Sequence, residues 1–223
     1  MANLERENGQ ILQSDGYLHA KRPHRERKST PKEPLSFAKT PESFLGMPCR
    51  TVEFRIPSKQ ERAARRTQFE MEKRAAFVKW LAETQQAALR KAGITKRQIE
   101  GMKHGYTPHG FNTHHKVPIF GGGTNDFSNL VLIRREPYHD MAHYHLINPQ
   151  TRGMKEGDTR NVVLPDPETP VYVPAPQYKF LEKWAKQGRK TYGKRKNVTL
   201  QDVLKEIKRR TAMCQAVGNG KGR

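Results

Sequence analysis

Apolar side chains between residues 58 and 92 recur at the spacing of an amphipathic helix. Ser58 occupies the position of an N-cap, and Glu61 follows three residues later, which is the signature of a capping box. Gly93 ends the pattern, and Thr95 can cap a second, short helix that runs to residue 103 or so. The face opposite the apolar stripe carries basic side chains: Arg62, Arg65, Arg66, Lys73 and Arg74. The simplest interpretation of that face is ordinary solvated charge.

The apolar pattern changes its period near the middle of the chain. Residues 111–117 and 129–133 are short runs of β-type composition, and the glycine-rich run 121–123 separates them. This arrangement predicts a hairpin with a wide loop. From Pro137 the period becomes helical, and proline suits the first turn of a helix. The predicted order is therefore strand, loop, strand, helix.

The flanking segments show less regular patterns. The first 57 residues are basic and rich in proline, and only residues 51–56 alternate as a short strand would. We therefore expect an α+β, helix-rich fold with a partly disordered N-terminal arm. The chain divides into five segments: an arm (1–57), a helical region (58–105), a core (106–150), a Pro-rich extended strap (151–177), and basic C-terminal helices with a tail (178–223).

Composition then narrows the class of protein. The 223 residues include 42 Lys and Arg against 22 Asp and Glu, a formal net charge of +20. Such an excess favours a polyanionic partner, with nucleic acid ahead of an anionic membrane surface. No stretch approaches the roughly 18 apolar residues of a membrane-spanning helix, and the N-terminus lacks a signal-peptide pattern. Two cysteines without Cys-x-x-Cys spacing exclude a disulfide framework and a thiolate zinc finger. We expect a protein made in the cytoplasm that would need a dedicated machine for export.

Seven of the nine histidines fall between residues 104 and 145. His139 and His143 are four residues apart on the predicted helix, so they share one face and can bind one metal ion. Adjacent residues of a strand point to opposite sides, so His114 and His115 can take different roles. If the helix packs across the hairpin, one of these two meets His139 and His143. Three imidazoles leave open coordination positions, which is typical of a catalytic metal site. A spare histidine could then deprotonate a water molecule that attacks a phosphodiester.

The same stretch matches a longer pattern: Gly-Phe-x-x-His-His-Lys-x-Pro-Ile, Gly-Gly, Asn-Asp-Phe-x-Asn-Leu-Val and His-x-x-x-His, all within residues 101–150. It resembles the HNH endonuclease motif of the ββα-metal superfamily. The likeness is nearest to the variant with a doubled histidine in colicin- and pyocin-type DNases and related bacterial toxin nucleases. The resemblance covers less than a quarter of the chain.

The resemblance implies a role for each anchor residue. His114, His139 and His143 would bind one divalent metal ion, and His115 would be the general base. The side-chain amide of Asn129 would hydrogen-bond to the loop backbone and hold the His115 ring in place. Imidazole ligands suit zinc or nickel, whereas magnesium or manganese often supports activity in such enzymes, so the metal stays open.

Other positions bear on substrate binding. Lys116, Arg134 and Arg135 flank the motif, and one or more could hold the scissile phosphate. The chain departs from the colicin-type pattern at Asn112, where an acidic residue is common two positions before the doubled histidine. The function of that carboxylate is therefore in doubt here.

The expected activity is hydrolysis of DNA with little sequence specificity, because phosphate contacts carry affinity but no sequence information. The preference for DNA over RNA rests on the resemblance alone. The first hypothesis for the biological role is an antibacterial toxin or effector that an acidic immunity protein neutralises. A phage or mobile-element HNH enzyme is the second hypothesis, and a non-catalytic basic nucleic-acid-binding protein is the third. The intact set of histidines and asparagine argues against the third.

Overall fold

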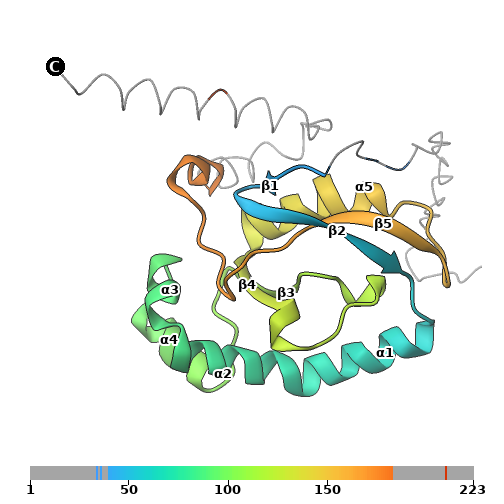
Figure 1. Ribbon diagram of the computed structural model, residues 1–223. Helices are drawn as coiled ribbons and strands as arrows, with labels where there is room; N and C mark the ends of the chain where they lie inside the picture. Colours follow the sequence, from blue (N-terminus) through green and yellow to red (C-terminus); the bar gives the residue numbers. More distant parts are fainter. Residues whose placement is uncertain (1–33, 35, 37–39, 183–208, 210–223) are drawn as a thin grey trace, which may run out of the picture. The chain divides into compact units, whose positions relative to one another are not determined.

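The computed structural model describes residues 34, 36, 40–182 and 209, and it has the mixed α+β composition that the sequence predicts (Figure 1). In this part of the chain a three-stranded antiparallel sheet has the order β1-β2-β5, and β3 and β4 form an antiparallel hairpin. The strands are Ser43–Phe44 (β1), Met47–Arg55 (β2), Phe111–His115 (β3), Leu130–Arg134 (β4) and Thr159–Pro165 (β5).

The predicted helix after residue 58 begins as expected, because the Ser58 hydroxyl accepts a hydrogen bond of 3.1 Å from the Glu61 backbone N–H. It runs through a π-helical turn and then breaks at Gln85, whose φ of −121° is not helical. Gly93 adopts a φ of +87°, and Thr95 forms a full capping box with Gln98 at the start of the next helix. The helical elements are α1 (Lys59–Gln68), the π-helical turn Phe69–Lys73, α2 (Arg74–Thr84), α3 (Gln86–Lys91) and α4 (Lys96–Lys103).

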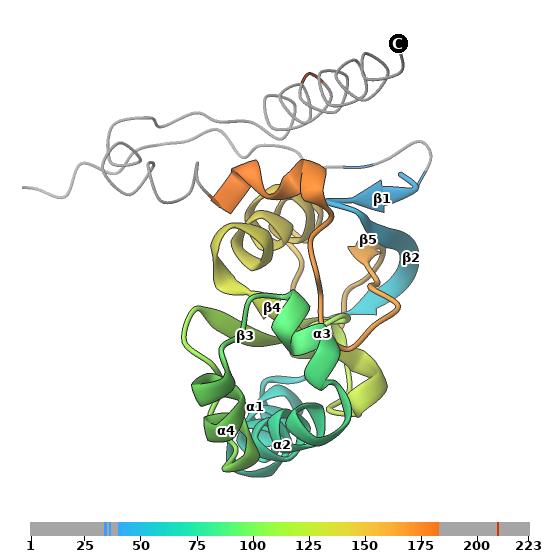
Figure 2. The same cartoon turned by 90° about the vertical axis from the view of Figure 1, so that its left-hand side faces the viewer.

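The helix predicted from Pro137 is present as a run of wide, π-type turns that ends in α5 (Asn148–Gln150); we call this segment helix 137–150. It lies on one side of the β3–β4 hairpin, and α1 and α2 lie on the other side (Figures 1 and 2). Val131 and Ile133 pack in the same core cluster as residues of helix 137–150. Leu130 and Leu132 pack in the cluster that contains the apolar stripe of α2. Strand alternation thus explains why the first four residues of β4, Leu130 to Ile133, are all apolar.

Two of the segments into which the sequence divides the chain contain more strand than expected. The arm was expected to extend to residue 57, but it includes β1 and β2, so the single strand predicted at 51–56 is part of a longer one. The strap expected at 151–177 contains β5, which pairs with β2 from Cys49↔Pro165 to Arg55↔Thr159. The pairing buries Val162 and Leu164 against Phe54. The predicted C-terminal helices lie largely outside the described residues, as does most of the arm.

Within the described residues, no helix has both the length and the apolar character needed to cross a membrane.

Candidate metal centre

Strand register sends the two adjacent histidines of β3 to opposite sides. In the β3–β4 hairpin His114 lies opposite Val131, and His115 lies opposite Leu130. Residues directly opposite each other in an antiparallel pair share a face of the sheet. His114 therefore faces helix 137–150, as Val131 does. His115 faces the opposite side, as Leu130 does, where α1, the π-helical turn and α2 form one continuous helix that we call the long helix.

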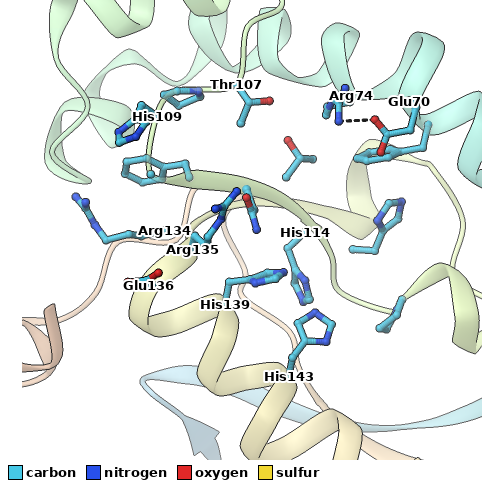
Figure 3. A pocket seen from close by; sticks show the side chains of 18 of the residues that line it. Glu70, Arg74, Thr107, His109, His114, Arg134, Arg135, Glu136, His139 and His143 are labelled. Atoms are coloured by element: carbon cyan, nitrogen blue, oxygen red, sulfur yellow. Dashed lines mark ion pairs between the residues drawn. The ribbon is translucent and has the colours of Figure 1, made fainter. Parts of the chain in front are cut away.

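His114 meets two further histidines on helix 137–150 (Figure 3). The centre of its ring is 5.1 Å from that of His139 and 5.1 Å from that of His143, and it stands nearly perpendicular to both. The His139 and His143 rings are 4.6 Å apart, one helical turn from each other. One potential ligand nitrogen from each of the three residues lies within 4.8 Å of the other two. These three imidazoles could hold a metal ion.

The electrostatics of the three rings suit a cation. The pKa of His114 lies well below its ordinary value, mainly because the ring is buried and also because His143 and His139 are close. Burial, followed by the proximity of His139, lowers the pKa of His143 to about 4. Both imidazoles are therefore neutral near pH 7, which is the form that binds metals. The Nε2 atom of His114 is buried and has no hydrogen-bond partner among the described residues. Such an atom is costly unless a ligand satisfies it, so the residues fit a bound ion.

An outer partner supports one of these ligands. The His139 Nδ1 lies 3.1 Å from a carboxylate oxygen of Asp140. A histidine that binds a metal through one nitrogen usually donates the hydrogen of the other to a carboxylate or carbonyl. Asp140 was not singled out from the sequence, although its position next to His139 was a usable signal.

His115 lies in a different environment. Its side chain is 9% exposed, and the ring packs against Phe69 with the two ring centres 4.5 Å apart. Its Nε2 lies 2.9 Å from Oδ1 of Asn125, a residue that sequence reasoning did not select. Burial lowers the pKa of His115; the hydrogen bond to Asn125 acts in the opposite direction, and the positive charge of Arg66 lowers the pKa further.

Asn129 makes the predicted hydrogen bonds to the loop backbone. Its Oδ1 accepts from the Val117 N–H at 2.9 Å, and its Nδ2 donates to the carbonyls of Val117 and Thr124 at 3.0 Å and 2.8 Å. It thereby joins the end of β3 to the far side of the loop. The side chain that hydrogen-bonds to the His115 ring is Asn125, so Asn129 supports the loop and Asn125 supports the ring.

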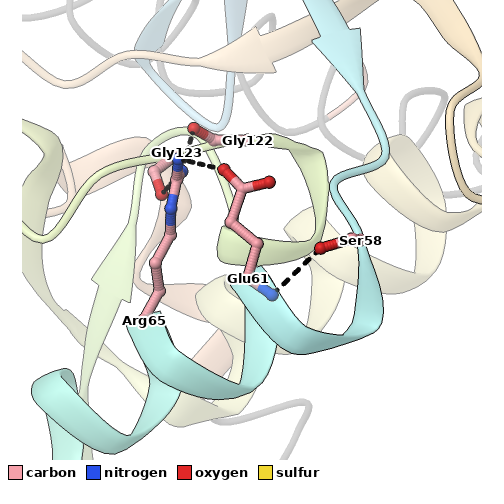
Figure 4. A network of polar contacts seen from close by, with 5 residues as sticks. All are labelled: Ser58, Glu61, Arg65, Gly122 and Gly123. Carbon is pink, nitrogen blue, oxygen red and sulfur yellow. Dashed lines mark hydrogen bonds and ion pairs between the residues drawn. The ribbon is translucent and has the colours of Figure 1, made fainter.

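The glycine-rich loop is clamped by a residue that the sequence left as solvated charge. Arg65 donates to the carbonyls of Gly122 and Gly123 at 2.6 Å and 3.0 Å and pairs with Glu61 at 2.7 Å (Figure 4). A Cβ atom on Gly123 would stand 1.7 Å from the Val117 carbonyl oxygen. The loop therefore fits closely between β3 and α1, and part of the basic face of the long helix is structural.

A pocket of about 970 Å³ adjoins the histidines. His114, His115, His139 and His143 all line it. Its walls are formed by the π-helical turn with its neighbours, the loop before β3, and the end of β4 (Figure 3). Three of the arginines that line it come from facing elements: Arg66 from α1, Arg74 from α2, and Arg135 from the position directly after β4. Arg66 and Arg135 are exposed, and Arg74 pairs with Glu70. Arg66 and Arg74 were expected to be ordinary surface charge.

The three predicted substrate-binding residues have different surroundings. Lys116 is 14% exposed, pairs with Asp166 at 3.2 Å, and is not among the residues that line the pocket. Arg134 lines the pocket, but its guanidinium lies over the Phe111 ring and donates to the Ala92 carbonyl at 3.2 Å. Arg135 alone of the three is both exposed and on the pocket wall.

Comparisons with known proteins give limited information. The chain is 36% identical over 121 residues to Uncharacterized protein YhhZ of Escherichia coli (strain K12). That alignment covers 53% of this chain but 29% of the relative, so the chain spans less than a third of that protein's length. No family model matches the sequence, and no solved structure matches the fold.

Proposed function

We propose that this chain is a metal-dependent endonuclease of the HNH type that hydrolyses DNA phosphodiester bonds with little sequence specificity. The observation that carries the proposal is the division of the His114–His115 pair. One histidine joins two others in a trio that could hold an ion, and its neighbour lines the same pocket from the opposite face of the strand.

His114, His139 and His143 would hold the metal ion. When bound, a divalent ion there would supply a Lewis acid that stabilises charge on the phosphate and on the leaving oxygen. The imidazole-only donor set favours zinc or nickel over magnesium and manganese. Asp140 would orient the His139 ring through its contact with Nδ1.

His115 would accept the proton of the attacking water. The lowered pKa keeps the ring neutral near pH 7, so a lone pair is available. Its packing on Phe69 and its hydrogen bond to Asn125 restrict the ring to one orientation. A base held in this way loses little conformational freedom when the substrate arrives.

Arg66 and Arg135 would bind phosphates on the two sides of the reacting group. Both are exposed on the pocket wall, and a guanidinium group matches phosphate geometry. The net charge of +20 would add affinity that falls steeply with salt and does not depend on base sequence.

The biological role that we propose is that of an antibacterial toxin or effector, exported by a dedicated machine and neutralised by an acidic immunity protein. The strongly basic chain and the resemblance to toxin nucleases support this role. An acidic partner would meet the same charges that would attract DNA.

Cleavage of supercoiled plasmid by the full-length protein tests the activity. We expect nicking with zinc, nickel, magnesium or manganese that EDTA abolishes, and loss of nicking in His115→Ala. His104→Ala is the matched control, because His104 is exposed and is not among the residues that line the pocket. DNA binding without cleavage under any of the four metals, together with no cleavage of RNA, would contradict the proposal and leave a basic binding protein.

A further inference from the structure

Asn125 is a buried residue that joins His115 to the long helix. It is 6% exposed and lies in the loop between β3 and β4. Its Oδ1 lies 2.9 Å from the His115 Nε2, and its Nδ2 donates to the Arg65 carbonyl at 2.9 Å and to the Gln68 Oε1 at 2.7 Å. All three contacts have good hydrogen-bond distances.

The orientation of this amide follows from its partners. The Arg65 carbonyl oxygen can only accept, so the group that faces it must be the NH₂ of Asn125. Flipping the amide would direct its oxygen at the Arg65 carbonyl oxygen and lose that hydrogen bond. The Oδ1 atom is therefore the group that faces His115.

The orientation of Asn125 in turn determines the protonation pattern of His115. An amide oxygen can only accept, so the His115 Nε2 must carry the hydrogen. A neutral imidazole has one N–H, so the lone pair is on Nδ1, which makes no hydrogen bond among the residues that the structure describes. We propose that Asn125 is a positioning residue that selects the Nε2–H tautomer of His115 and leaves Nδ1 as its basic nitrogen.

The two acceptors that hold Asn125 both belong to α1, which also clamps the glycine-rich loop through Arg65. The long helix therefore fixes the loop at its backbone and fixes the His115 tautomer through a single side chain. The assignment of the tautomer stands on hydrogen bonding alone. Only its consequence for catalysis rests on the proposed function, in which His115 is the base.

Two-bond ¹H–¹⁵N correlation spectra of the histidine rings test the tautomer directly. The full-length, metal-free protein is measured at about pH 7.5, above the ordinary histidine pKa of about 6.5, and His115→Ala identifies the signals. We expect a protonated Nε2 and an unprotonated Nδ1 for His115. Asn125→Ala should shift both nitrogens toward the average of two exchanging tautomers.

Asn112→Ala is the matched control, because Asn112 lines the same pocket but makes no hydrogen bond with His115. It should leave the His115 pattern unchanged. In cleavage assays Asn125→Ala should lower kcat about 10- to 100-fold, which is part of the roughly 10²- to 10⁴-fold that a general base contributes, while KM and zinc affinity stay constant.

A wild-type His115 with its hydrogen on Nδ1 would overturn the inference, and so would an Asn125→Ala spectrum identical to that of the wild type. If Asn125→Ala does not fold, the wild-type spectrum decides, since an unprotonated Nε2 of His115 there contradicts the inference. If no variant cleaves DNA or RNA with any metal, the proposed function fails while the tautomer result stands on its own spectra.

Discussion

His114 and His115 are neighbours in sequence, but their ring nitrogens have different partners. The His114 ring lies beside two more imidazoles, and its Nε2 has no hydrogen-bond partner among the described residues, whereas the Nε2 of His115 is satisfied by Asn125. An unsatisfied buried polar atom costs about 1–3 kcal/mol, so a metal ion bound to the three imidazoles, which could hold one, would offset this cost. The His115 side is complete without one.

This difference shows how one strand can serve two purposes. The pleat sends one side chain of the pair to helix 137–150, where a metal ion could be held, and the other to the long helix, where a ring is fixed. The two sides share the backbone of β3, the loop that follows it and the pocket that all four histidines line. Substitutions can therefore be chosen that damage both sides, one side, or neither.

The largest expected effect comes from a substitution in the loop that supports both the histidine trio and His115. Gly123→Ala would bring a Cβ within 1.7 Å of the Val117 carbonyl, so the loop must move away from β3 and from Arg65. We expect a loss of more than about 3 kcal/mol in the free energy of unfolding, measured by urea denaturation. Gly101→Ala is the control, because it is helical with no atom within 4 Å of the added Cβ. A Gly123→Ala protein as stable as Gly101→Ala would show that the loop is not closely fitted.

A smaller effect, confined to the metal side, is expected from Asp140→Asn. It removes the carboxylate next to the His139 Nδ1 and should lower zinc affinity about 10- to 100-fold, measured by isothermal titration calorimetry. Cleavage should return when zinc is in excess, because His115 is untouched. Glu72→Gln, an exposed carboxylate on the long helix, is the control. Equal zinc affinity in both variants would show that Asp140 does not support metal binding by His139.

The smallest effect is expected at the pocket wall, away from both the histidine trio and His115. Arg66→Ala should weaken DNA binding and reduce the slope of log affinity against log salt by about 1, measured by fluorescence anisotropy without metal. Lys116→Ala should leave the slope unchanged, because Lys116 is paired with Asp166 and is not among the residues that line the pocket. A smaller slope in Lys116→Ala and an unchanged slope in Arg66→Ala would support the sequence-based expectation that Lys116 binds phosphate.

The sequence was informative where the signal was local. The spacing of His139 and His143, the alternation of β3 and the glycine run are all contained within 40 residues. They were sufficient to predict the hairpin, the helix after it and the three histidines that meet. Strand periodicity alone left open which histidine of the pair would face the helix, because that depends on the register with β4.

The sequence was uninformative where contacts between distant segments determine the local structure or the role of a side chain. β5 pairs with β2 more than 100 residues away, and prolines around it hid the strand. Arg65 and Arg66 have the sequence pattern of ordinary surface charge. Only the folded structure shows that Arg65 binds the glycine-rich loop and that Arg66 lines the pocket. Asn125 is the first residue of the Asn-Asp-Phe-x-Asn-Leu-Val pattern, but it acts through acceptors on α1, about 60 residues earlier in the chain, so the local pattern does not indicate its role.

Zinc titration and plasmid cleavage, carried out on His114→Ala and His115→Ala in parallel, test the central claim most directly. We expect His114→Ala to lose both zinc binding and cleavage. His115→Ala should bind zinc as the wild type does and lose cleavage by about 10²- to 10⁴-fold. If His115→Ala also lost zinc, or if His114→Ala kept it, the two histidines would not have separate roles and the account would be wrong.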